Sequence, residues 1–118
     1  MKRLPVMLAA VFALVAITAH TETSDGKRLF EKRCAGCHSL DHDKEGPRLA
    51  GVYGRAAGSV ASFNYSDALK SSHITWDAAS LDKWLAGPDK VLPETDMAFH
   101  VESATERSAI IAYLREVR

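Results

Sequence analysis

Cys34-Ala35-Gly36-Cys37-His38 places two cysteines two residues apart and follows them at once with a histidine. This spacing is typical of a covalent attachment site for a c-type haem, because the two thiols then reach the two vinyl groups on one edge of the porphyrin. The next residue can turn one imidazole nitrogen onto the iron, which makes His38 the predicted proximal ligand. The motif therefore predicts one haem c, with its iron, covalently bound to each chain.

Two other uses of a Cys-x-x-Cys pair compete with haem attachment. A structural zinc site needs two more ligands at their own spacing, and the sequence has no third cysteine. A thioredoxin-like redox pair lies beside a βαβ pattern, and no such pattern is found. The motif favours haem, and both alternatives stay open at this point.

The composition is that of an ordinary globular protein. The chain has 118 residues, which suits one domain, and 47% of them are hydrophobic. The formal net charge is zero, and without a basic excess nothing indicates a nucleic-acid partner. Both cysteines lie in the motif, so a disulfide framework is not expected.

The N-terminus carries an export pattern. Lys2 and Arg3 precede the apolar run Leu4–Ala19, which ends in small residues. This predicts a signal peptide over residues 1–19, cleaved after its last alanine, and a single domain over residues 20–118. An uncleaved membrane anchor is the alternative, but the run is shorter than the ~20 residues that a spanning helix needs.

Export fits the motif, because cysteine pairs are used for haem attachment in the bacterial periplasm, outside the reducing cytosol. We therefore expect a periplasmic protein. Removing Lys2 and Arg3 leaves 13 basic and 15 acidic residues, a net charge of −2. A domain of this size has a small core, so an apolar cofactor would supply part of its interior.

Helix signals occur in three places, and no alternating strand pattern is found, which predicts an all-α fold. Thr23 and Ser24 are N-cap candidates for a first helix from about Asp25 to Arg33. Gly26 lies inside this helix, where glycine is unfavourable by about 1 kcal/mol relative to alanine, so we expect another helix to approach closely there.

The other two helices have clearer boundaries. Asp77 can cap a helix from about Ala78 to Ala86, which Gly87-Pro88 would end. Ser103-x-x-Glu106 is a capping box that opens the last helix. The apolar face of that helix follows at helical spacing in Ile110, Tyr113, Leu114 and Val117.

The motif and the glycine-rich loop after it resemble a known family. Gly-Pro-x-Leu-x-Gly-x-x-Gly-Arg-x-x-Gly begins at Gly46, and together with the haem motif it is similar to class I cytochrome c of the mitochondrial and bacterial cytochrome c2 type. The resemblance covers nearly the whole chain from about Ser24. It implies a small all-α fold of four to five helices around the haem, with the first and last helices crossing near Gly26, Phe30, Ile110 and Tyr113.

Met97 is the only methionine after the apolar N-terminal run, and it matches the position of the family's axial methionine. The resemblance therefore implies His38 and Met97 as the two iron ligands. A core methionine is the alternative for Met97, and His73 and His100 are rival ligands. His42 follows His38 by four residues but lies among charged residues in an expected solvated turn.

The resemblance also implies the groups around the ligands. The carbonyl of Pro47 should accept the second N–H of the proximal histidine. The haem propionates need donors, and the family's propionate-contacting positions correspond to Arg55, Tyr65 and Trp76, with Thr95 as a further donor.

The sequence departs from the family near the haem. Glu94 stands where relatives commonly have glycine, Leu69 replaces a common asparagine, and Trp84 replaces a common tyrosine near the methionine sulfur. Asp89 and Asp96 stand where relatives often have docking lysines. These departures bear on the reduction potential and on the choice of partner.

The implied function is that of a soluble one-electron carrier rather than an enzyme. We expect a monomer whose partners are redox proteins: a donor such as a bc1-type complex, and an acceptor such as a terminal oxidase, a peroxidase or a reaction centre. The alternative is a peroxidase-like haem protein with an open iron site, which would require Met97 off the iron.

Overall fold

The structure is a computed structural model that describes residues 20–118. The predicted signal peptide over residues 1–19 lies outside the described residues. Residues 20–33 are helical, and four further helices follow: α2 (Asp67–Lys70), α3 (Ala78–Ala86), α4 (Pro88–Val91) and α5 (Ala104–Glu116). The only β pairing among the described residues is an isolated bridge between Ala56 and Thr75. The predicted all-α class is confirmed.

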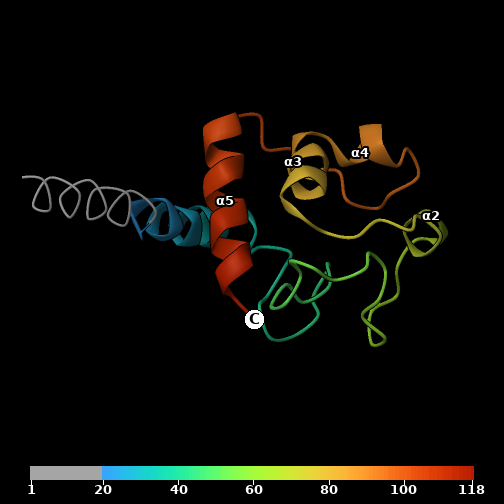
Figure 1. Cartoon of the computed structure of the whole chain (residues 1–118). Coiled ribbons are helices and arrows are strands. Elements are labelled where there is room, and N and C mark those ends of the chain that lie inside the picture. Colours follow the sequence, from blue (N-terminus) through green and yellow to red (C-terminus); the bar gives the residue numbers. More distant parts are fainter. Residues whose placement is uncertain (1–19) are drawn as a thin grey trace, which may run out of the picture.

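The N-terminal helix and α5 cross in close contact (Figure 1). A Cβ on Gly26 would collide with the backbone carbonyl of Ala109 and with the Cβ of Tyr113. One turn later the rings of Phe30 and Tyr113 pack with their centroids 5.6 Å apart. The predicted close approach at Gly26 and the predicted crossing are therefore both confirmed.

The predicted start of this helix was wrong. Thr23 and Ser24 are not N-caps, because residues 20–24 are already helical. Contacts with α5 hold this extra turn: Ser108 donates to the Glu22 carboxylate at 2.6 Å, and the Thr23 hydroxyl donates to Glu116 at 3.3 Å. Tertiary contacts of this kind override the capping preference of a single residue.

α3 begins and ends where the sequence predicts. The Asp77 carboxylate accepts from the backbone N–H of Ser80, whose hydroxyl accepts from the backbone N–H of Asp77, and together they form a capping box. Gly87 ends α3, and Pro88 is the first residue of α4. The buried face of α3 consists of Leu81, Trp84 and Leu85.

α5 has only half of the predicted capping box. The Ser103 hydroxyl accepts from the backbone N–H of Glu106, as expected. The Glu106 carboxylate instead accepts from the Arg33 guanidinium at 3.0 and 3.2 Å, which ties α5 to the end of the N-terminal helix. Val117 lies just past the helix end as its C-cap.

The core lies where the N-terminal helix, α3 and α5 meet the irregular segments. α3 packs against both α4 and α5. The irregular segments over residues 34–66 lie on one side of the helices (Figure 1), with Val52 and Trp76 joined to the helical core. Within residues 20–118, no helix is long and apolar enough to cross a membrane. The buried core residues are Leu29, Phe30, Val52, Trp76, Leu81, Trp84, Leu85, Val101, Ala109, Ile110, Ile111, Tyr113 and Leu114.

Candidate haem site

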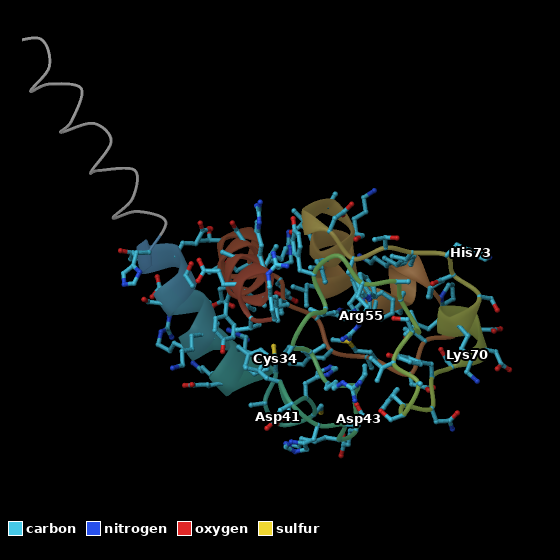
Figure 2. The ribbon with its side chains drawn as sticks, turned by 60° about the horizontal axis from the view of Figure 1, so that its bottom comes forward. Cys34, Asp41, Asp43, Arg55, Lys70 and His73 are labelled. Carbon is cyan, nitrogen blue, oxygen red and sulfur yellow. The ribbon has the colours of Figure 1, made fainter. Side chains whose placement is uncertain are left out.

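The Cys-x-x-Cys-His motif forms one tight turn at the end of the N-terminal helix. The backbone N–H groups of Cys34 and Ala35 both donate to the carbonyl of Phe30, which continues the helix by its last turn. The N–H groups of Cys37 and His38 then both donate to the carbonyl of Cys34, at 3.1 and 2.8 Å. Both thiols are free, and Figure 2 shows Cys34 at the point where the helix gives way to the loop.

The ring of His38 is held by the loop that follows. Its Nδ1 lies 2.8 Å from the carbonyl of Pro47, which can only accept, so Nδ1 carries the proton and Nε2 is left with its lone pair. Burial lowers the pKa of His38, although the bond to Pro47 opposes this shift, so the imidazole is neutral near pH 7. A Cβ on Gly46 would collide with the ring, so glycine is needed at that position. A neutral imidazole with one free nitrogen is the form that binds a metal.

A short strap over residues 44–46 closes over the motif. Lys44 Nζ donates to the carbonyl of Ala35 at 2.8 Å, and the N–H of Gly46 donates to the carbonyl of Cys37 at 2.8 Å. The Cys37 thiol donates to a carboxylate oxygen of Glu45 at 3.3 Å. These contacts join residues eight or nine apart in a turn without regular structure, so no sequence periodicity could have indicated them.

The two thiols differ in surroundings but both are protonated near neutral pH. Burial raises the pKa of Cys34 to about 11. The hydrogen bond to Glu45 raises the pKa of the exposed Cys37 thiol. Since the thiolate is the nucleophilic form, neither cysteine is set up as a reactive redox thiol.

Met97 lies in the irregular segment between α4 and α5. Its sulfur accepts a hydrogen bond from the indole N–H of Trp84, with 3.1 Å between Nε1 and Sδ. Its backbone N–H is 3.5 Å from the Thr95 hydroxyl oxygen. Met97 and Cys34 are both partly buried against the same hydrophobic core, so one predicted ligand and one predicted attachment residue border the same apolar region.

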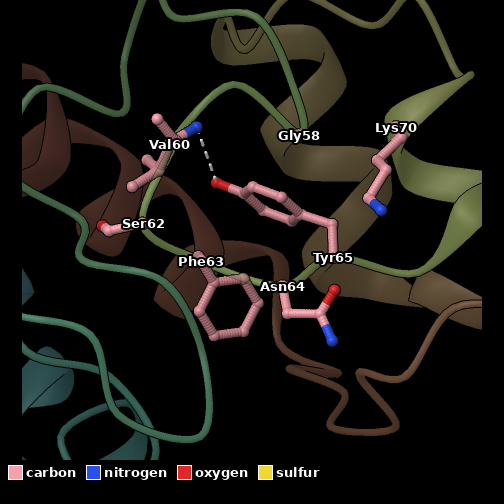
Figure 3. A pocket seen from close by; sticks show the side chains of 8 residues that line it. Gly58, Val60, Ser62, Phe63, Asn64, Tyr65 and Lys70 are labelled. Atoms are coloured by element: carbon pink, nitrogen blue, oxygen red, sulfur yellow. Dashed lines mark hydrogen bonds between the residues drawn. The ribbon is translucent and has the colours of Figure 1, made fainter.

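Two of the predicted propionate contacts, Arg55 and Trp76, lie side by side, and a third, Tyr65, is buried. The backbone N–H of Trp76 donates to the carbonyl of Arg55 at 3.0 Å, which places these two residues side by side. The Arg55 guanidinium donates to the carbonyls of Arg48 and Ala50, and burial lowers its pKa. Tyr65 is buried, and its hydroxyl accepts from the backbone N–H of Val60 at 3.1 Å (Figure 3).

The remaining histidines lie on the surface. His42 contacts Asp41 and the Ser39 hydroxyl in an exposed turn, as expected. His100 pairs with Asp89 at 2.9 Å. His73 is exposed, and in Figure 2 it lies beside Lys70, far from Cys34. Within residues 20–118, no group of three or more histidine, cysteine or acidic side chains is arranged to hold a metal ion.

The donor set and its surroundings fit a c-type haem. Two free thiols and a neutral imidazole with an available Nε2 lie in one turn, and the histidine ring is packed where glycine leaves room for it. A thioether is the usual partner of histidine in low-spin haem proteins that transfer electrons. Indole, phenol and guanidinium groups supply donors of the kind that anionic propionates need.

Comparison with known proteins agrees with this fit. The chain matches the family model described as cytochrome c over residues 23–118. It is 43% identical over 96 residues to the cytochrome c of Euglena viridis, covering 79% of this chain and 94% of that protein. It is 44% identical over 87 residues to cytochrome c2 iso-2 of Magnetospirillum fulvum, covering 71% and 91%. Among solved structures, cytochrome cH from Methylobacterium extorquens matches with a TM-score of 0.75 and 40% identity, covering 79% of this chain and 96% of that one.

Proposed function

Because this chain belongs to the cytochrome c family, and therefore is an electron carrier with covalently bound haem c, we propose that it works as a soluble carrier in the periplasm. Its partners are redox proteins. The donor we propose is a bc1-type complex, and the acceptor a terminal oxidase, a peroxidase or a reaction centre. We propose that it acts as a monomer and catalyses no reaction of its own.

Within this function, Cys34 and Cys37 would hold the haem through thioether bonds, and His38 and Met97 would hold its iron. The observation that carries this assignment is the His38 ring, whose Nδ1–H is fixed on Pro47 so that Nε2 is presented as a ligand. Arg55, Tyr65, Trp76 and Thr95 are the proposed propionate contacts.

The bound haem supplies the couple between ferric and ferrous iron. Electron transfer is fast when few atoms rearrange, and the residues of this chain restrain the side chains that would hold the iron. Pro47 and Gly46 restrain the His38 ring, and Trp84 restrains the Met97 sulfur, so neither ligand has to move when the charge changes. Because His38 and Met97 would both hold the iron, they would leave it no open position for a substrate.

The N-terminal sequence supports the periplasmic assignment. Residues 1–19 have the charged start, apolar run and small residues of a signal peptide, and we propose cleavage after Ala19 to release residues 20–118. N-terminal sequencing of the protein from a periplasmic fraction tests this: a chain beginning at His20 is expected. A chain that keeps Met1 and sediments with membranes would contradict the cleavage.

The attachment residues are tested by removing both thiols. We expect Cys34→Ser with Cys37→Ser to abolish covalent haem, so that acid–organic extraction leaves no haem on the denatured chain. The wild-type chain should retain its haem under the same treatment, and each single variant should keep one thioether. Haem that extracts freely from the wild type would contradict the assignment of these cysteines.

A further inference from the structure

The segment that joins α4 to α5 lies on the surface of the molecule (Figure 1). We call residues 92–103 the Met97 segment; most of them are exposed, among them Glu94, Asp96 and Glu102. Asp89 of α4 belongs to the same surface, because its carboxylate lies 2.9 Å from Nε2 of His100 in this segment. These four acids, Asp89, Glu94, Asp96 and Glu102, are called the acidic surface below.

Few bases accompany the acidic surface. Lys90 is the only lysine or arginine from residue 88 to residue 106, and the next base, Arg107, is largely buried and bonded to Asp82. Four acids and one lysine give this part of the chain a net charge of −3. Since the chain has a net charge of −2 after the proposed cleavage, all other residues together carry +1. The whole acidic excess therefore lies on this surface.

Most of these acids have no role within the fold. Within residues 20–118, the carboxylates of Glu94, Asp96 and Glu102 form no ion pair, whereas the nearby Glu106 pairs with Arg33 at 3.0 Å. Like charges gathered on one surface repel one another and work against the compact state. Their arrangement is therefore explained better by a cationic group outside this chain than by the stability of the chain itself.

An apolar side chain lies among the acids. Phe99 is 43% exposed, and it is the only large hydrophobic residue that is exposed within residues 20–118. It lies three residues after Asp96 and three before Glu102. Protein interfaces commonly place an aromatic side chain inside a polar rim, where the ring is buried by the partner. The acidic surface thus has the composition of a face that binds another protein.

We propose that this protein docks through the acidic surface, and that its redox partner presents a basic face, with lysine or arginine side chains around an apolar contact for Phe99. The inference rests on the proposed function as an electron carrier. It reverses the charge that the family resemblance implies at Asp89 and Asp96. Docking there brings the partner to the segment that carries Met97, one of the two proposed iron ligands.

The complementarity acts at short range. Exposed charges interact over about one Debye length, which is about 10 Å at 0.1 M salt. The positive balance of the remaining residues weakens the field farther from the surface, so a partner senses these acids mainly at contact. A basic face is attracted there, and an acidic face meets like charges, which is unfavourable by several kcal/mol in a close interface. The acids therefore select the partner more than they speed the encounter.

The test measures the sign of the charge where electrons pass. Cationic hexaammineruthenium(II) reduces the ferric holoprotein, and anionic hexacyanoferrate(III) oxidises the ferrous holoprotein, each by one electron. At about 0.01 M salt, Glu94→Gln with Asp96→Asn should slow the reaction with the cationic reagent about two- to fivefold and speed the reaction with the anionic one. Stopped-flow kinetics measure both rates, and potentiometry of each variant corrects them for any change in driving force.

A matched control removes the same charge elsewhere. Asp25→Asn with Glu31→Gln neutralises two exposed acids on the N-terminal helix. It should change either rate by less than about 1.5-fold, because these acids lie outside the acidic surface. Equal effects of the two double variants would show that only the net charge matters, and that result would overturn the inference.

An oligolysine peptide provides a direct probe of binding. In nitrogen-15-labelled holoprotein, the amide resonances that shift on adding the peptide should belong to residues 89–102, and they should stop shifting in Glu94→Gln with Asp96→Asn. Shifts centred on the N-terminal helix instead, or none within residues 89–102, would overturn the inference. Failure of the proposed function would be seen separately, as a holoprotein that exchanges electrons with neither metal complex.

Discussion

Gly26 and Gly46 act at the scale of single atoms. Each lacks a Cβ, and a neighbouring group occupies the space that a Cβ would take. At Gly26 the neighbours are the carbonyl of Ala109 and the Cβ of Tyr113, and at Gly46 the neighbour is the ring of His38. One glycine thus sets the distance between two helices, and the other sets the position of the proposed proximal ligand. Neither role depends on a left-handed backbone conformation.

Gly26→Ala should destabilise the protein. Alanine is the better helix former by about 1 kcal/mol. A buried clash against backbone usually costs about 1–3 kcal/mol or more, and Ala109 cannot move without shifting α5, so the clash should win. Urea unfolding of the holoprotein measures the difference. Gly36→Ala is the matched control, since a Cβ there meets nothing within 4 Å; equal effects of the two variants would contradict the argument.

Met97→Ala should remove the sulfur ligand. We expect a high-spin or histidine-substituted iron, a lower reduction potential and raised peroxidase activity, because a thioether favours ferrous iron and its loss opens a coordination position. Absorption, potentiometry and a peroxidase assay check the three effects. Met97→His supplies imidazole in place of the thioether, so it should also lower the potential but should not raise peroxidase activity. Wild-type spectrum and potential in Met97→Ala would exclude Met97 as the ligand.

At the scale of elements, the segment carrying Met97 depends on Arg107 in α5. The Arg107 guanidinium donates to Asp82 of α3 at 2.7 Å and to the carbonyls of Val101 and Glu102. Its side chain is only 14% exposed. One side chain therefore joins α5, α3 and the end of the Met97 segment.

Arg107→Ala should lower the free energy of unfolding by about 2 kcal/mol, since it breaks charge-assisted hydrogen bonds to groups that stay partly buried. The same change should increase the affinity of ferric iron for imidazole, because the Met97 segment loses an anchor. Chemical denaturation and imidazole titration measure both. Asp82→Ala, whose carboxylate is half exposed, should have a smaller effect on each. If Arg107→Ala changes stability but leaves imidazole affinity unchanged, the segment does not depend on this anchor.

The N-cap of α3 makes the stability of the protein depend on pH. Hydrogen bonds from the Ser80 backbone and hydroxyl lower the pKa of Asp77, so the folded state favours the carboxylate. The contribution of the Asp77 carboxylate to the free energy of unfolding is complete above the pKa of an unfolded aspartate, about 3.9. It is lost as the pH falls through the lower pKa of the folded state. Asp77→Ala should therefore melt at a lower temperature at pH 7, with a gap from wild type that narrows below about pH 4. Asp77→Asn keeps a capping oxygen without titrating, and a constant gap for Asp77→Ala down to pH 3 would contradict this account.

The elements that could be predicted from the sequence are those whose signals are local. α3 was predicted to the residue because Asp77 and Gly87-Pro88 mark its ends within the chain itself. The four-residue helices α2 and α4 are too short to show a helical period, and they were not predicted. The signals at Thr23 and Ser24 placed the start of the N-terminal helix too late, because residues 20–24 are already helical and contact α5.

The residues of the candidate site also fall into two groups, those that the sequence indicates and those that only the structure shows. His38 and its acceptor Pro47 could be named in advance, since the motif and the resemblance place them. The strap contacts of Lys44 and Glu45 could not be, because they depend on how an irregular turn closes in space. The Trp84 contact was foreseeable only as a replaced residue near the sulfur, and its direction needed the structure.

At the scale of the whole molecule, exposed charges of both signs lie on the same elements. α4 and the Met97 segment carry the exposed acids Asp89, Glu94, Asp96 and Glu102 together with Lys90. The N-terminal helix carries the exposed bases Lys27, Arg28 and Lys32 together with Asp25 and Glu31. With a net charge of −2 after the proposed cleavage, the two groups should largely cancel at a distance. The field that steers a partner is therefore expected to be weak.

Electron transfer to an acidic-faced oxidase should then depend only mildly on ionic strength. Between about 0.01 and 0.2 M salt the Debye length falls from about 30 Å to below 10 Å, and we expect the rate to change by about threefold or less. Stopped-flow kinetics measure it. Replacing Asp89 and Asp96 by lysine should create a steep loss of rate with salt. A tenfold or greater loss in the wild type would instead show a strongly basic docking face.

The crossing at Gly26 sets an order of events for the folding chain. The N-terminal helix packs on Ala109 and Tyr113, which lie near the other end of the sequence. A chain emerging from a ribosome or passing through a translocation channel cannot close this core until its last helix is free. Closing so long a loop costs entropy before the contacts repay it, so this crossing adds to the barrier that the completed chain must pass. The chain therefore stays without its completed core throughout synthesis, and it can reach the folded state only when the last helix becomes available.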